Sequence, residues 1–504
     1  MMYYKCGMSK QIKDLILEIK QLKTENKALA TENHKIKQKL QVLENSIDQK
    51  IATAIQKATQ PLIKQINQLE NENTHKNTEI LRLKTQINKT SQNSSKPPST
   101  NNQYKKTIHN NREKTNKKPG AQKGHKGNTL TIPKNLDQLI KEGKAKKHTI
   151  DQTNGATNYI SKWQIDLEIT VVYTEYRLPH PNIPTISYGK NIKALTVLLS
   201  NNGLIAEGRL CDFFYDISNE LITISDATIE KFNYQAAQNV NLEEIKQDLL
   251  NGEVLNVDET TSRCVERLEY GQAVPLAAVN SSFNAVVRTH SGATATLLTV
   301  NPYKDDEGIV RDGIVPLFCG ILSHDHDKKY YKYGALHAAC GAHLSRELRG
   351  LFELYHIEWA ERFRRFYVGL NDYKCGSDVC VDLVLLEFEL MYDALVCEGE
   401  VFLKSMRSRC FGFVELRRLL KRLRVFKDAY LLFIRDYRAP FTNNLAERDL
   451  RHCKTKQKVS GCFRSWRGLE CYVRIRSFLS TETKRNHQLL PAVKTLFTKT
   501  PTPC

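Results

Sequence analysis

The chain has 504 residues and a formal net charge of +20. At about 100–200 residues per domain, this length predicts three or four units. The surplus of Lys and Arg favours a polyanionic partner, with nucleic acid ahead of an anionic membrane surface. No apolar run reaches the ~18 residues of a membrane-spanning helix, and the polar, basic start is not a secretory signal. The 13 cysteines are scattered along the chain. Without a secretory signal, they favour reduced thiols in a cytoplasm over a secreted disulfide framework.

Residues 9–88 are predicted to form a coiled coil. The two core positions of the heptad hold Ile12, Ile19, Asn26, Asn33, Leu40 and Ile47 at a, and Leu15, Leu22, Leu29, Ile36 and Leu43 at d. Leu at d with Asn at a favours two parallel strands, because each buried Asn finds a partner only in that register. The phase breaks near Pro61, where we expect the helix to end or kink, and a shorter heptad then runs from Ile66 to Ile87. We expect a homodimer; a solvated helix packed on its own protein is the alternative.

Residues 89–127 are basic and rich in Pro, Gly, Ser and Asn, with Glu113 as the only acid. This composition cannot build a core, so it predicts a disordered or extended linker. Its cations are either solvated or lie along DNA phosphates. The candidates for DNA contact are Lys117, Lys118, Lys123 and Lys126.

Residues 128–190 are expected to form a small mixed module with a strand at Ile165 to Tyr176. Residues 191–250 are expected to be helical. Their apolar face is formed by Ala194, Leu195, Leu198 and Leu199, and Ser225 is positioned to cap a helix that begins near Ile229. Short helices joined by tight turns suit a helix-turn-helix DNA reader, and equally any small bundle.

Two aspartates follow apolar runs that we expect to be strands. Val254 to Val257 ends on Asp258, and a run from Ile314 to Leu322 ends just before His324 and Asp325. Further strands are expected at Ala273–Val279 and Ala285–Thr289, with a turn at Asn280, Ser281 and Ser282, and helices from Tyr333 to about Ile434. A carboxylate at a strand end projects from the sheet edge, where a hard cation such as Mg²⁺ can reach it. Asp at a strand end is also common as a turn or cap residue, so the spacing alone does not decide.

A third acid, Glu447, lies in a helix that Asn443 or Asn444 can cap. Residues 443–465 read NNLAERDLRHCKTKQKVSGCFRS. This stretch resembles the signature around the catalytic Glu of the insertion sequence 66 family of bacterial DDE transposases. The resemblance extends to VDET at 257–260, to GILSHDHDKKYYKYGALHAACGAHLSREL at 320–348, and to the linker motifs SSKPPST at 94–100 and KKPGAQKGHKG at 117–127.

The resemblance implies an α+β, mixed fold with a ribonuclease H-like catalytic core. This core would span residues 251–480, with a helical insertion at about 335–435 and a C-terminal tail at 481–504. Asp258, Asp325 and Glu447 would be the catalytic residues, with Asp325 rather than Asp327 as the second acid. They would hold two Mg²⁺ ions, for which Mn²⁺ can substitute. The implied reaction is Mg²⁺-dependent DNA strand cleavage and strand transfer of an insertion sequence.

The resemblance also brings in three neighbouring residues. Cys340 and His343 align with a Cys-x2-His element, and Trp359 aligns with the Trp of a Trp-Ala pair in the helical insertion. His343 either orients the second acid or a phosphate, or simply packs; Trp359 either stacks on a displaced base or belongs to the core. Relatives carry a zinc-ribbon-like module after the linker, but residues 128–190 contain no cysteine. We therefore expect a degenerate module there and no zinc.

The expected partners are DNA and a second copy of the chain. Beside Glu447, the candidates for phosphate contact are Arg448, Arg451, Lys454, Lys456, Lys458, Arg464 and Arg467. The family implies double-stranded transposon ends and target DNA, accessory proteins of the element, no membrane, and a place on the bacterial nucleoid. Two alternatives remain open: a catalytically decayed relative that binds transposon-end DNA as a dimer, and another ribonuclease H-like nuclease acting on branched DNA.

Overall fold

The computed structural model describes residues 4–90, 92–94, 132–143, 145–150, 163–165, 168–174, 186–269, 272–275, 283–334, 336–408 and 410–498. The chain divides into two compact units, Met1–Lys89 and Thr90–Cys504. Among the described helices, none combines the length and the apolar character needed to cross a membrane. The linker lysines Lys117, Lys118, Lys123 and Lys126 lie outside the described residues.

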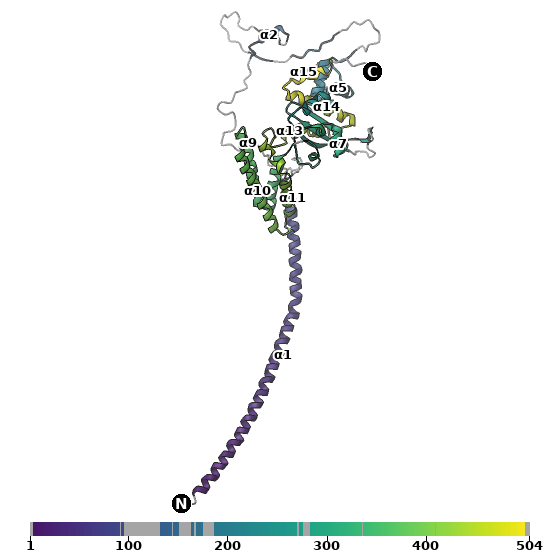
Figure 1. Ribbon diagram of the computed structural model, residues 1–504. Helices are drawn as coiled ribbons and strands as arrows, with labels where there is room; N and C mark the ends of the chain where they lie inside the picture. Colours follow the sequence, from purple (N-terminus) through teal and green to yellow (C-terminus); the bar gives the residue numbers. More distant parts are fainter. Residues whose placement is uncertain are drawn as a thin grey trace. The chain divides into compact units, whose positions relative to one another are not determined.

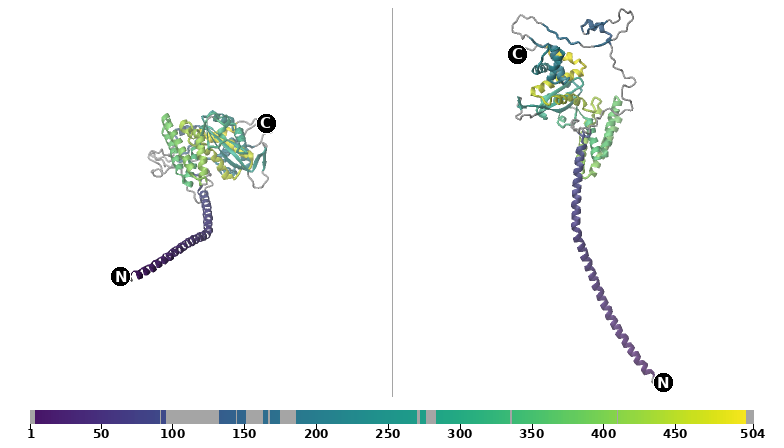
Figure 2. Two further views of the ribbon diagram at one scale, coloured as in Figure 1. Left: turned by 60° about the horizontal axis from the view of Figure 1, so that its bottom comes forward. Right: turned by 180° about the vertical axis from the view of Figure 1, so that it is seen from behind.

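The first unit is a single curved helix, α1 (Tyr4–Asn88; Figures 1 and 2). Of the two outcomes expected near Pro61, an end of the helix is wrong, because Pro61 lies inside α1. A proline removes one backbone donor, and the turns on both sides of it keep the helix continuous. The apolar residues of the heptad are exposed along this helix; Leu22, for example, is 54 % exposed. A long helix therefore carries an apolar stripe without a partner inside the chain's own first unit.

The second unit begins with small helices. They are α2 (Leu136–Lys141), α3 (Lys190–Asn201), α4 (Glu207–Ile217), α5 (Asp226–Asn239) and α6 (Leu242–Leu250). The predicted cap is present, since Ser225 Oγ accepts a hydrogen bond from Thr228 N at 3.4 Å. Leu210, Phe214 and Ile229 form a small core between α4 and α5. The strand predicted at Ile165 to Tyr176 is wrong for the described part, where residues 165 and 168–174 have no regular structure.

A five-stranded mixed sheet forms the centre of the second unit, with the order β5-β4-β1-β6-β7. Its strands are β1 (Val254–Cys264), β4 (Phe283–Ser291), β5 (Thr296–Asn301), β6 (Ile321–His324) and β7 (Leu336–Ala339). β1, β4 and β5 are antiparallel neighbours, whereas β6 runs parallel to β1 and β7 parallel to β6. A separate hairpin pairs β2 (Glu266–Glu269) with β3 (Gln272–Pro275).

Apolar clusters lie on both faces of the sheet. Leu297 and Leu298, successive residues of β5, belong to different clusters, because side chains alternate between faces along a strand. Helices α14 (Trp466–Lys484) and α15 (Leu489–Thr495) supply much of this packing, and Val493 of α15 is fully buried. The stretch expected to be a C-terminal tail thus includes the end of α14 and the packed helix α15.

The strand predictions need three corrections. β1 extends to Cys264, so Asp258 lies within a strand and not after one. The run from Ile314 to Leu322 is mostly not a strand: it contains the 3-10 turn η3 (Val315–Leu317), and only residues from Ile321 on belong to β6. Leu336–Ala339, expected to be helical, is the edge strand β7. Two further short elements, α7 (Asp306–Asp312) and η4 (Tyr330–Lys332), connect these strands.

The helical insertion follows β7. It consists of α8 (Gly341–Tyr355), α9 (Glu358–Gly376), α10 (Asp382–Ser405), α11 (Phe413–Val425) and α12 (Lys427–Arg435) and leads to α13 (Asn444–Ser460). Figure 1 labels α9, α10 and α11 beside one another, and they share one apolar core. The insertion leaves and rejoins the sheet at one point, where Gly341 N donates to Phe441 O at 2.8 Å. A Cβ on Gly341 would lie 2.5 Å from the Phe441 ring, so this junction requires glycine.

Trp359 belongs to that core. Its side chain is 2 % exposed, and its ring nitrogen donates to Leu395 O at 2.7 Å. A ring buried between α9 and α10 cannot stack on a DNA base, so of the two roles considered for Trp359 the structure supports core packing.

Two helical glycines give opposite predictions for the insertion. Gly369→Ala should raise the free energy of unfolding by about 0.5–1 kcal/mol, since alanine favours helix and nothing lies within 4 Å of the added Cβ. Gly399→Ala should lower it by about 1–3 kcal/mol, because its Cβ would lie 2.6 Å from Trp359 and 2.7 Å from Leu420. Thermal and urea unfolding of the full chain measure both. Shifts of the same sign would contradict the packing of α9 on α10.

Candidate active site

Strand pairing brings two of the predicted acids side by side. Val257 of β1 is the parallel partner of His324 in β6, and Ala339 of β7 pairs with the same His324. The next residues are Asp258, Asp325 and Cys340. Because parallel neighbours advance in step, these three residues lie at one level across the sheet. They mark the edge at which β6 and β7 end and beyond which β1 continues.

Asp325, which follows β6, is contacted by two side chains from other elements. His343 Nδ1, in the first turn of α8, lies 3.2 Å from Asp325 Oδ1. Asn443 Nδ2 donates to the same oxygen at 3.2 Å and to Val257 O at 2.8 Å. Asn443 occupies the N-cap position of α13, but its side chain makes no capping hydrogen bond. It connects the second acid to β1 instead.

Glu447 approaches the same place from the first turn of α13. Its Oε1 lies 3.4 Å from Arg346 Nη2 and 4.0 Å from His343 Nδ1. One ligand atom from each of Asp325, Cys340, His343 and Glu447 falls within 4.8 Å of all the others. The structure therefore brings Asp325 and Glu447 together with the Cys-x2-His pair. Asp258 lies outside this tightest group and is coupled to it electrostatically.

The charges of the site are strongly coupled. Burial raises the pKa of Asp258 to about 7, and repulsion from Asp325 and Glu447 adds to the shift. Burial alone would also raise the pKa of Asp325, but the interactions with His343 and Asn443 hold it below its usual value. Burial alone would lower the pKa of His343, yet the neighbouring Asp325 carboxylate and Cys340 raise it to about 10. The site concentrates negative charge that is only partly balanced.

The loop after Asp325 turns the next two residues away. His326 has a positive φ of 67° and packs among Tyr331, Phe426 and Tyr430. Asp327 accepts a hydrogen bond from Lys329 N at 3.1 Å, and its carboxylate lies 3.4 Å from Lys304 Nζ. Asp327 therefore closes the loop that follows β6, while Asp325 faces His343 and Asn443.

A buried polar network fixes α13 to the sheet. Asp449, two residues after Glu447, accepts hydrogen bonds from Ser291 Oγ at 2.6 Å and Thr296 Oγ1 at 2.9 Å. Lys484 Nζ of α14 lies 2.9 Å from the same carboxylate oxygen. Burial alone would raise the pKa of Asp449, but the Lys484 charge and these hydrogen bonds hold it below its usual value. Three elements thus position the helix that carries Glu447.

The basic residues near Glu447 lie along α13, in the turn after it and at the start of α14. Arg448, Arg451, Lys454, Lys458, Arg464 and Arg467 are exposed, and Lys456 is half-buried. Lys454 Nζ donates to Thr261 O at 2.7 Å, so this cation is partly engaged within the protein. Our reasoning from the sequence missed Arg346, Asp449 and the tethering role of Asn443. Arg346 could have been found from its helical spacing, three residues after His343.

The fold and this cluster define a mixed α+β protein with acidic side chains gathered where parallel strands end. The family model described as Transposase IS66 family matches residues 187–471, which is more than half of the chain. The chain therefore belongs to the IS66 transposase family, as the sequence motifs indicated, and this membership makes it a DNA-processing enzyme of the transposase class. Residues 49–131 match a family of unknown function (DUF6444). None of the curated proteins compared with the chain matches it.

The Asp449 network gives a stability prediction. Asp449→Asn keeps the volume but leaves Lys484 buried without its counter-charge, so the free energy of unfolding should fall by about 3 kcal/mol. The double variant Asp449→Asn with Lys484→Met should recover part of that loss, because it also removes the uncompensated charge. Urea unfolding of the four proteins of this cycle measures the coupling. Strictly additive effects would contradict the interaction.

Proposed function

We propose that this chain is a DDE transposase in which Asp258, Asp325 and Glu447 carry the Mg²⁺-dependent cleavage and strand transfer of an insertion sequence. Three acids support this proposal within a member of a transposase family: Asp325, which follows β6, gathers with Glu447 of α13, and Asp258 of β1 lies level with Asp325 and is repelled by both. The acids are separated by long stretches of sequence, and a core does not need them together. A site for divalent cations does.

The donor set fits hard cations. Asp258, Asp325 and Glu447 offer carboxylate oxygens, and the raised pKa of Asp258 reflects burial and then repulsion that a bound cation would relieve. When bound, two Mg²⁺ ions, or Mn²⁺ in their place, supply activation of a water or 3′-hydroxyl and stabilisation of the leaving oxygen. Asn443 orients Asp325, while His343 and Arg346 offset the negative charge around it.

Zinc fits less well, although Cys340 and His343 lie in the cluster. Cys340 Sγ accepts a hydrogen bond from Asn443 N at 3.2 Å, and His343 Nδ1 faces the Asp325 carboxylate. Both side chains are thereby engaged in positioning the acid and the start of α13. We assign them this positioning role and no zinc.

The order of strands supports a ribonuclease H-like core. Three antiparallel strands, β5-β4-β1, continue into two parallel strands, β6 and β7, with the first acid on the central strand. The helical insertion then falls between the second acid and Glu447, as the family resemblance implies. Residues 251–480 are accordingly proposed as the catalytic domain, and residues 191–250 as a helical DNA-binding unit.

The acids should be essential for the chemistry and dispensable for DNA binding. Asp258→Asn, Asp325→Asn or Glu447→Gln should each lower strand transfer by orders of magnitude, because each removes charge that would hold the cations while keeping the volume. A strand-transfer assay with candidate terminal sequences and Mg²⁺ measures this.

Asp327→Asn is the matched control and should be far milder, since Asp327 contacts Lys304 and Lys329. Full activity of the Glu447→Gln protein would overturn the mechanism. If the unmodified chain binds end DNA but transfers no strand, the alternative of a catalytically decayed relative is correct.

We further propose that α1 pairs with α1 of a second copy in a parallel coiled coil. The exposed leucines of the d position support this, because burying such a stripe against its copy removes apolar area from water. A dimer would then double the proposed DNA contacts in one assembly. These contacts come from the exposed cations of α13 and from the linker lysines outside the described residues.

The dimer prediction concerns the full chain in sedimentation. Replacing Leu22 and Leu29 by Pro should yield monomer, since each proline costs the helix about 3 kcal/mol or more. Replacing the exposed Thr24 and Thr31 by Ala, at the outer f position of the heptad, should leave the dimer intact. An unmodified chain that is monomeric at micromolar concentration would exclude the coiled coil.

A further inference from the structure

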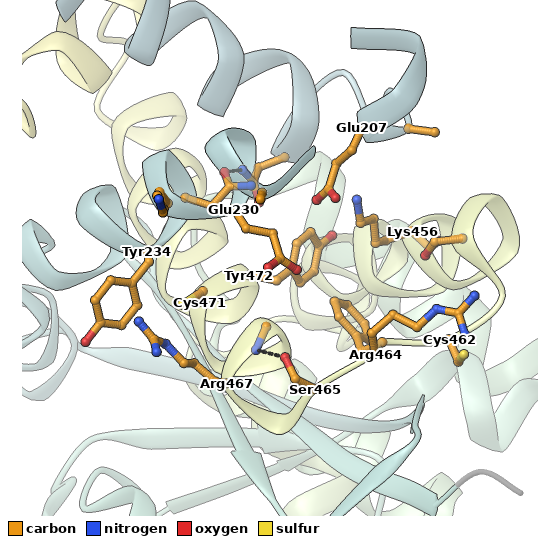
Figure 3. A pocket seen from close by; sticks show the side chains of 18 residues that line it. Glu207, Glu230, Tyr234, Lys456, Cys462, Arg464, Ser465, Arg467, Cys471 and Tyr472 are labelled. Atoms are coloured by element: carbon orange, nitrogen blue, oxygen red, sulfur yellow. Dashed lines mark hydrogen bonds between the residues drawn. The ribbon is translucent and has the colours of Figure 1, made fainter. Parts of the chain in front are cut away.

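A second candidate site lies away from the carboxylates. A pocket of about 610 Å³ opens between the helical unit and the C-terminal helices. Its lining comes from α4 and α5 on one side and from α13, the turn after it, and α14 on the other. The side chains that matter most are Glu207, Glu230, Tyr234, Lys456, Arg464 and Tyr472 (Figure 3). The volume is in the range that holds a small organic ligand.

Several polar groups in this pocket lack a partner. Tyr472 is 3 % exposed, and its hydroxyl has no hydrogen-bond partner. Figure 3 shows its ring between Glu230 and Lys456. Glu207 and Lys456 face the same space at half-buried positions, and their opposite charges attract each other without a close ion pair among the described residues. A buried hydroxyl is normally paired, so the unpaired Tyr472 hydroxyl beside these half-buried charges favours a polar ligand.

The charge pattern indicates what kind of ligand fits. Burial, then the charge of Glu230, raises the pKa of Glu207, while burial lowers the pKa of Lys456. Arg464 is exposed at the rim of the pocket (Figure 3). The guanidinium carbon of Arg467 lies 3.4 Å from the ring centroid of Tyr234, in cation–π contact. A ligand with an anionic group, a planar ring and hydrogen-bond donors matches all of these features.

We propose that this pocket binds one unpaired DNA nucleotide, with its base inside and its phosphate at the arginines. Carboxylates such as Glu207 and Glu230 accept hydrogen bonds from an exocyclic amino group, as carboxylates do from cytosine N4. The Tyr472 hydroxyl adds a further polar contact, and the Arg467–Tyr234 pair offers a surface on which a base stacks. The inference rests on the proposed function, in that DNA is the substrate.

A strand that leaves the carboxylates can reach the pocket only by passing around α13. Glu447 and Lys456 belong to the same helix, α13, and are nine residues apart. At ~1.5 Å and ~100° per residue, Lys456 lies ~14 Å along the helix axis from Glu447 and projects from the opposite side of α13. A few nucleotides span that distance. One end of the helix thus serves the reacting phosphodiester, and the other serves a nucleotide beside it.

Fluorescence anisotropy of the full chain with labelled 24-base-pair duplexes in EDTA tests the pocket. Four duplexes of one sequence are compared: fully paired, with one bulged dC, with one bulged dT, and with one bulged abasic site. The unmodified protein should bind the bulged dC roughly tenfold more tightly than the abasic bulge, since stacking and pairing of one base contribute about that much. The bulged dT, which lacks an exocyclic amino group, should bind more weakly than the bulged dC.

Two variants separate the contacts. Tyr472→Phe removes only the unpaired hydroxyl and should reduce the preference for a base over the abasic site by at least threefold, with no loss of folding. Glu207→Gln should reduce the preference for dC over dT. Tyr215→Phe, an exposed tyrosine of α4 outside the pocket, is the matched control and should change neither ratio.

Equal affinities for the base-bearing and abasic bulges would overturn the proposal that the pocket binds a base, even if both affinities exceed that for paired DNA. Unchanged ratios in both variants also overturn it, because another site would then hold the base. The assay needs no chemistry, so it fails independently of the proposed function. A preference for the base-bearing bulge without strand transfer would support the pocket and contradict the transposase mechanism. The absence of any DNA binding would contradict both.

Discussion

The gathering of three carboxylates is the constraint around which the site and its supporting contacts are arranged. Asp258, Asp325 and Glu447 are brought together in partly buried surroundings, where the pKa of Asp258 is raised to about 7 by burial and then by repulsion. Such an arrangement costs free energy, so it persists only where the scaffold holds each acid firmly. Parallel pairing of β1 with β6 provides the first restraint, since it fixes two of the acids at the same level of the sheet.

The third acid needs a restraint that the sheet cannot provide, because Glu447 lies on a helix far along the chain. Asn443 connects the start of α13 to Val257 and Asp325, and Asp449 fixes the next turn to β4, β5 and α14. Both residues lie within four positions of Glu447. The helix is thereby anchored on both sides of the acid, and His343 and Arg346 reduce the repulsion that remains.

Local sequence signals predicted some of these features and missed others. The first helix and the Ser225 cap followed from periodicity and capping residues, whereas the α+β class followed from the family resemblance. The run from Ile314 to Leu322 was misread because an apolar stretch suits a strand, whereas Pro316 lies in a 3-10 turn there. β7 is only four residues long and contains two alanines, so it carries little strand signal.

The contacts that position the acids could not be predicted from local sequence patterns. Asn443 resembled a helix cap, and its actual partners lie 118 and 186 positions away. The carboxylate of Asp449 meets residues 153 and 158 positions away. No periodicity reports such pairings. The acids themselves entered through the family motifs, and their assignment remains a prediction for the strand-transfer assay.

The hydrogen bond between Gly341 and Phe441 has an evolutionary consequence. The helical insertion begins and ends at adjacent points of the backbone. The positions of its ends therefore do not restrict how many residues lie between them. Helices could be gained, lost or exchanged within it while Cys340 and Asn443 keep their places beside Asp325. Related proteins should therefore differ most within this helical insertion. The narrow glycine junction, which has no room for a side chain, should hardly vary at all.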